Sequence, residues 1–131
     1  MRYNKYRVSN KADRTLDGIV FASKLEMNRY SFLLMMQRTG KIYSLCRQRS
    51  FKLCDDFFIG GKKKRGIKFT IDFEYVRMKD NVHVVEESKG YPSRDYIVRL
   101  AWFLSKGLDL QFHEIKDANE IGGIETEKGV K

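Results

Sequence analysis

The chain has 131 residues, of which 42% are hydrophobic and 13% aromatic, which excludes a largely disordered protein and fits one domain with a real core. Lysine and arginine outnumber aspartate and glutamate by 26 to 17, so the net charge is +9 and a polyanionic partner, first of all nucleic acid, is expected. No apolar run reaches the roughly 20 residues of a membrane span, and the start lacks the apolar stretch of a signal peptide. We therefore expect a cytoplasmic protein without a membrane partner, in which Cys46 and Cys54 are free thiols.

The first half of the chain predicts an arm, a helix and a strand. Residues 1–16 are polar and basic and are expected to form an N-terminal arm. A helix is expected over 23–40, because Ser23 is a favourable N-cap, Glu26 completes a capping box and apolar residues recur at helical spacing. Residues 43–55 alternate in places, as a strand does, and 60–66 are expected to be a loop with four consecutive cations.

The second half predicts a hairpin, a second helix and a last strand. Residues 67–78 alternate well, a turn is expected at 79–81, and 82–90 would be the partner strand. A helix over 93–107 then precedes a strand over 108–115. Residues 17–115 would thus form one α/β (α+β) domain with the order αβββαβ, and residues 116–131 a flexible charged tail.

The stretch VVEESKG, residues 84–90, brings two acids and a lysine to the end of a strand. Side chains alternate between the two faces of a strand, so Glu87 and Lys89 share one face while Glu86 and Ser88 share the other. The pairing with the preceding strand decides which of these side chains meets an acid across the hairpin.

Asp72 is that acid. A two-residue turn at 80–81 would place Asp72 opposite Lys89 and diagonal to Glu87, on the same face. A one-residue change in loop length would bring Asp72 to Glu86 instead. The turn residues favour the two-residue turn.

These side chains suit metal-dependent hydrolysis of a phosphodiester bond. Asp72 and Glu87 would supply carboxylate oxygens to Mg²⁺ (or Mn²⁺), and the backbone carbonyl of Ser88 a third oxygen. Lys89 would lie beside the attacking water, where it would orient or deprotonate that water and stabilise the charge that grows on the phosphate.

Asp72 followed by Glu87-Ser88-Lys89, on consecutive strands of an αβββαβ chain, resembles the PD-(D/E)XK nuclease superfamily, with ID in place of PD. The strings DGIVFASKLEMNRY, IDFEY and EESKG are similar to small phage-encoded nucleases of this superfamily, and the size and charge are similar to those of archaeal-type Holliday junction resolvases. The resemblance implies a restriction-endonuclease-like core with a mixed central sheet flanked by helices. It also implies that Glu26 is a further metal ligand, directly or through water, and that Gln48 and Tyr96 lie near the metal.

The expected function is therefore a Mg²⁺-dependent DNA endonuclease. We expect it to be structure-selective, to cut Holliday junctions or other branched DNA in phage recombination, repair or replication, and to act as a homodimer in the bacterial cytoplasm. The alternatives are a nuclease fold that binds DNA without cleavage, and a basic structural or regulatory protein of another fold. The residues expected to contact DNA are Lys62, Lys63, Lys64, Arg65, Arg94, Arg99, Lys5, Arg7 and Arg14.

Each site residue also has a simpler interpretation. Glu26 could serve only as a cap of its helix. Asp72 could lie on a solvated polar face, and Glu87 and Lys89 could form an exposed ion pair of little stabilising value. These three simpler interpretations would have to coincide, which favours the active site.

A zinc site is disfavoured, because the spacing of the cysteines and histidines, Cys46, Cys54, His83 and His113, matches no zinc motif. The cysteines are expected to be small core residues. The apolar run at 101–104 is expected to be core or a dimer contact.

Overall fold

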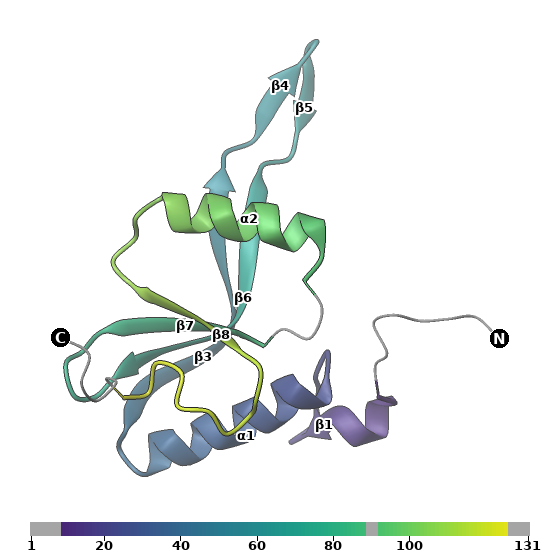
Figure 1. Cartoon of the computed structure of the whole chain (residues 1–131). Coiled ribbons are helices and arrows are strands. Elements are labelled where there is room, and N and C mark those ends of the chain that lie inside the picture. The colour runs from purple at the N-terminus through teal and green to yellow at the C-terminus, as the bar shows by residue number, and fades with distance from the viewer. Residues whose placement is uncertain (1–8, 89–91, 126–131) are drawn as a thin grey trace.

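The computed structural model describes residues 9–88 and 92–125 of the chain. It confirms an α+β fold with a mixed four-stranded central sheet flanked by two helices (Figure 1). The strands lie in the order β3 (Ile42–Cys54), β6 (Ile67–Arg77), β7 (His83–Ser88) and β8 (Gln111–Ile115). β3 and β6 pair antiparallel, as do β6 and β7, whereas β8 is parallel to β7, because α2 crosses over between them.

The two helices begin and end where the local signals predict. Helix α1 (Lys24–Arg38) begins after Ser23, whose Oγ accepts from the Glu26 backbone N–H at 3.1 Å. Helix α2 (Arg94–Ser105) begins after Ser93, whose Oγ accepts from a backbone N–H in the first turn in the same way. No helix in the described part of the chain is long and apolar enough to cross a membrane.

The pairing of β6 with β7 differs from the prediction. Phe73 pairs with Glu86, and the Arg77 N–H still donates to the Val82 carbonyl at 2.9 Å, so the connection is a four-residue loop over 78–81. The predicted two-residue turn is therefore wrong, and the register is shifted by two residues. The buried Arg77 guanidinium closes this longer loop through two hydrogen bonds, both 2.9 Å, to the Asp80 carboxylate.

Strand β6 passes between two apolar clusters. One cluster packs against α1 and contains Phe73, whereas the other packs against α2 and contains Ile71, although the two residues share strand parity. The two clusters therefore meet along β6 at Asp72. Across from Asp72 in β3, Gln48 has a left-handed φ of 54°, a local irregularity of the partner strand.

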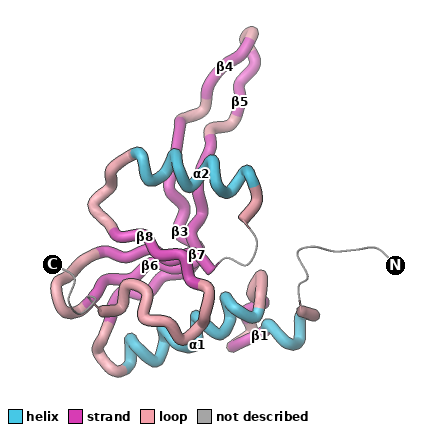
Figure 2. Tube along the Cα trace, viewed as in Figure 1, coloured by secondary structure: helices cyan, strands magenta, loops and turns pink. Residues whose placement is uncertain are grey.

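Two short hairpins extend this core. β1 (Thr15–Leu16) pairs with β2 (Ile19–Val20), after a 3₁₀ turn at Lys11–Arg14. β4 (Phe57–Ile59) pairs with β5 (Lys62–Lys64) and projects beyond the sheet (Figure 2). The prediction of a loop over 60–66 is thus wrong for the three lysines. The turn is Gly60-Gly61, both with positive φ, which is the backbone that a two-residue hairpin turn requires.

Residues 116–125 are not the flexible tail that was expected. Ile124 is 2% exposed and belongs to the cluster under α1. The Gly123 carbonyl accepts from the buried Arg77 guanidinium at 3.0 Å. An apolar side chain and a buried cation thus hold the end of this segment against the core, while most of its other residues are exposed.

Candidate active site

Asp72 and Glu87 are held side by side by hydrogen bonds between β6 and β7. The Asp72 backbone N–H donates to Glu87 Oε1 at 3.1 Å, and the Ser88 backbone N–H donates to Asp72 Oδ2 at 2.8 Å. Each carboxylate is therefore oriented by the backbone of the other strand. The predicted proximity of the two acids is confirmed, but Asp72 lies opposite Glu87, not diagonal to it.

Gln48 links this pair to Glu26 of α1. Its Nε2 lies 3.2 Å from Glu26 Oε2 and 3.5 Å from Asp72 Oδ1. The pKa of Glu26, which is 3% exposed, is raised to about 7, first by burial and then by the negative charge of Asp72. The Glu26 backbone N–H is thus capped by Ser23, and its carboxylate lies near the acids of the sheet. Its role as a metal ligand stays a prediction.

Arg47 partly balances this negative charge and was missed from the sequence. Its guanidinium nitrogen lies 3.8 Å from Glu26 Oε2, which lowers the pKa of that carboxyl against the effect of burial. The same guanidinium lies over the ring of Phe21, 4.5 Å from its centroid, and 5.7 Å from that of Tyr30. No local motif marks such a residue, since its partners lie in α1 and in the segment just before it, far from Arg47 in the sequence.

Tyr96 of α2 reaches the other side of the acids. Its hydroxyl donates to Glu114 Oε2 of β8 at 2.7 Å. Burial raises the pKa of Tyr96, and the charges of Glu114, Glu87 and Asp72 raise it further, so the hydroxyl stays protonated. The predicted nearness of Gln48 and Tyr96 to the acids is confirmed. Glu114, whose position pairs with Glu87 in the parallel register, was missed as a neighbour of the site.

The donors gathered here fit a hard divalent cation. Among the described residues no three His, Cys, Asp or Glu side chains form a metal site by themselves. Mg²⁺, however, binds proteins through one or two carboxylates and completes its shell with water and substrate phosphates, and Asp72 and Glu87 supply that number. Ser88 Oγ is buried with no hydrogen-bond partner in the described chain, but by strand parity it lies on the face of Glu86 and not on that of Glu87.

The cysteines and histidines do not provide a second donor set. Cys46 is exposed, so the prediction of a core residue is wrong for it, and Cys54 is half-buried. His83 is exposed at the start of β7 and has the strand parity of Glu87. With His113, these side chains form no group of three metal ligands within residues 9–88 and 92–125.

The predicted DNA contacts differ in how much of each side chain is available. The cations of the hairpin and its root, Lys62 to Arg65, are all exposed, and Lys63 is 3.5 Å from Asp56. Arg94 is exposed at the start of α2. Arg99 donates to Asp95 at 3.0 Å and to the Lys68 carbonyl at 2.7 Å, so its guanidinium is engaged within the protein.

Arg14 is engaged within the protein as well. Its guanidinium donates to the carbonyls of Ser9, at 2.9 Å, and Phe21, at 2.5 Å. Contact of these arginines with DNA stays a prediction. Lys5, Arg7 and Lys89 lie outside the described residues.

A family model with the description "Protein of unknown function (DUF1064)" matches residues 3–122. Comparisons with curated proteins and with solved structures gave no match. Since the matched span covers well over half of the sequence, the chain belongs to the DUF1064 family.

Proposed function

We propose that this protein is a Mg²⁺-dependent (or Mn²⁺-dependent) endonuclease that hydrolyses phosphodiester bonds of branched DNA. The observation that carries the proposal is the pair of carboxylates that β6 and β7 hold side by side. Asp72 and Glu87 each accept a backbone N–H from the other strand, at 2.8 and 3.1 Å, and Gln48 joins Glu26 to them. Such preoriented carboxylate oxygens suit the binding of a hard divalent cation.

Each residue of the site has its own proposed role. Asp72 and Glu87 would hold the cation, together with the carbonyl of Ser88. A carboxylate oxygen has two lone pairs, so a backbone hydrogen bond orients it without using it up. A bound Mg²⁺ would polarise the phosphoryl oxygen and lower the pKa of water. Glu26, which Gln48 joins to the pair, would act on the cation through water, and Lys89 is proposed to orient or deprotonate the attacking water.

Affinity for DNA would come from cations away from these acids. The net charge of +9 and the exposed side chains of Lys62, Lys63 and Lys64 support binding through phosphates. Phosphate contacts position the protein and carry no direct sequence information, which suits recognition by shape. Two strands cut symmetrically at a junction need two such sites, so we include a homodimer in the proposal.

The test is a cleavage assay with a matched control variant. A synthetic four-way junction, a duplex and a plasmid are incubated with the protein, with and without Mg²⁺. Asp72→Asn should bind junction DNA but not cut it. Glu74→Gln should cut normally, because Glu74 has the strand parity of Asp72 but pairs with the surface residue Arg49 at 3.0 Å.

Two outcomes would refute the proposal in different ways. Junction binding without cutting by the wild type under any divalent cation would favour the non-cleaving DNA-binding protein. No binding to any of the three DNAs would favour a basic protein of another function.

A further inference from the structure

The β4–β5 hairpin has one apolar strand and one cationic strand. Its register pairs Phe57 with Lys64, Phe58 with Lys63 and Ile59 with Lys62. Paired residues share a face, so both faces of the ribbon carry apolar side chains along one edge and ammonium groups along the other. A ribbon with this pattern has no buried face of its own.

The apolar edge is exposed to solvent. Phe57, Phe58 and Ile59 are 41%, 69% and 60% exposed, and none belongs to either apolar cluster of the described chain. Three consecutive large apolar side chains in water are unfavourable, and such a patch marks a binding surface. The neighbouring lysines indicate that the partner is anionic.

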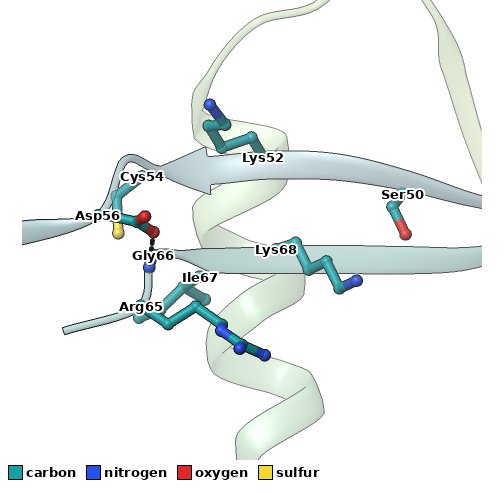
Figure 3. A pocket seen from close by; sticks show the side chains of 8 residues that line it. All are labelled: Ser50, Lys52, Cys54, Asp56, Arg65, Gly66, Ile67 and Lys68. Atoms are coloured by element: carbon teal, nitrogen blue, oxygen red, sulfur yellow. Dashed lines mark hydrogen bonds between the residues drawn. The ribbon is translucent and has the colours of Figure 1, made fainter.

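The root of the hairpin is fixed. The Gly66 N–H donates to Asp56 Oδ1 at 2.7 Å where β3 and β6 leave the sheet (Figure 3). A Cβ at Gly66 would lie 2.3 Å from the Cys54 carbonyl oxygen, so the two backbone segments at the root are closer than any residue but glycine allows. Arg65 and Lys68 line a pocket of about 330 Å³ at this root and add cationic charge. The hairpin therefore projects from a fixed root that carries positive charge.

We propose that this hairpin is a DNA wedge: the lysines of β5 contact phosphates, while Phe58 and Ile59 pack against bases that have lost a stacking neighbour. Duplex DNA hides its apolar base faces, and a branch point exposes them. Phe and Ile are side chains that proteins insert at opened base steps, and base faces stack on aromatic rings. The inference rests on the proposed nuclease function and names its substrate class as DNA with unstacked bases.

The dimensions of the hairpin agree with this role. Three strand residues at about 3.3 Å each give a reach of roughly 10 Å, comparable with the ~8.5 Å depth of the major groove. Lys63 precedes Asp72 by nine residues. The wedge and the acids are thus at most about 30 Å apart along the ribbon, or about nine base pairs. We expect cleavage within that distance of the unstacked bases.

The experiment measures binding in the presence of Ca²⁺ and, separately, EDTA, so that cleavage is not needed. The DNAs are a four-way junction with 2-aminopurine at the branch point and a linear duplex built from the same arm sequences. The test variant is Phe58→Ser with Ile59→Ser, and Phe58→Trp retains an aromatic face. The control is Met78→Ser, since Met78 is 47% exposed in the loop that follows the opposite end of β6.

The double-serine variant should lose roughly tenfold or more in junction affinity, change little toward the duplex, and melt at the wild-type temperature. Phe58→Trp and Met78→Ser should keep the junction preference. The 2-aminopurine signal should respond to wild type and not to the double-serine variant.

Equal losses on both DNAs, or no loss on either, would overturn the wedge. So would unchanged affinity with a changed sedimentation coefficient, because the apolar edge would then cover a second copy of the chain. Junction preference that depends on Phe58 in a protein that never cuts would retain the wedge and reject the nuclease. Cutting with no dependence on Phe58 would do the reverse.

Discussion

The two adjacent glutamates of β7 should respond in opposite ways to the same substitution. Glu86 is fully buried, and its carboxylate accepts from Arg29 at 2.8 and 2.6 Å and from the Tyr75 hydroxyl at 2.5 Å. Burial and then the charge of Glu86 raise the pKa of Tyr75, so this hydroxyl remains a donor. Glu87 faces Asp72 on the other side of the strand, where its carboxylate serves the proposed chemistry.

Glu86→Gln removes the counter-charge of a guanidinium that is 0% exposed. Breaking one partner of a buried ion pair costs about 3–5 kcal/mol, against a total stability of about 5–15 kcal/mol for a domain. At a few degrees per kcal/mol, the melting temperature should fall by about 10–20 °C. Glu87→Gln keeps an oxygen for the Asp72 N–H and should cost less than about 1 kcal/mol.

Thermal unfolding followed by circular dichroism, with junction cleavage measured well below the transition, separates the two effects. Glu86→Gln should melt early and still cut, whereas Glu87→Gln should melt normally and not cut. Replacing both Arg29 and Glu86 by leucine should restore part of the lost stability, because no buried charge remains. A melting temperature of Glu86→Gln within about 2 °C of wild type, or loss of cutting in Glu86→Gln alone, would refute this assignment.

Three further outcomes are expected. Excess EDTA should abolish cleavage, and Ca²⁺ should support junction binding without cutting, as measured by gel shift and product analysis; undiminished cutting in EDTA would exclude the metal. Lys89→Ala should bind DNA with wild-type affinity and fail to cut, so retained cutting would remove Lys89 from the chemistry. Neutralising the four cations of the hairpin and its root should weaken binding to DNA of any sequence. The slope of log affinity against log salt concentration should become shallower by about 0.9 per lost phosphate contact. An unchanged slope and affinity would mean that none of these four side chains, Lys62, Lys63, Lys64 and Arg65, contacts DNA.

The helices could be predicted because their signals are local. Ser23 and Ser93 each accept a backbone N–H of the first turn, and Gly40 and Gly107 follow the last turns with positive φ. These contacts lie within a few residues of one another. A sequence therefore carries them without knowledge of the fold.

Contacts between distant elements were beyond the same reasoning. Arg29 lies in a helix, where an arginine is normally solvated. It is buried here because it pairs with Glu86, which is 57 residues away in the sequence. The pairing of Tyr96 with Glu114 likewise depends on how α2 crosses to β8. The β4–β5 hairpin does carry a local signal, because Gly60-Gly61 lies between a short apolar run and a short run of lysines.

The acids could be assigned although the register was wrong, and the reason is the parity of a strand. The loop is two residues longer than predicted, and a two-residue shift moves each side chain along β7 without changing its face. The residue opposite Asp72 is therefore Glu87 and not the predicted Lys89, but Asp72 and Glu87 lie on the same face as predicted. A one-residue shift would have brought Asp72 to the face of Glu86, whose carboxylate is already held by Arg29. The buried ion pair thus excludes the one alternative that would have moved the site, because turning Glu86 toward Asp72 would leave a guanidinium buried without its counter-charge.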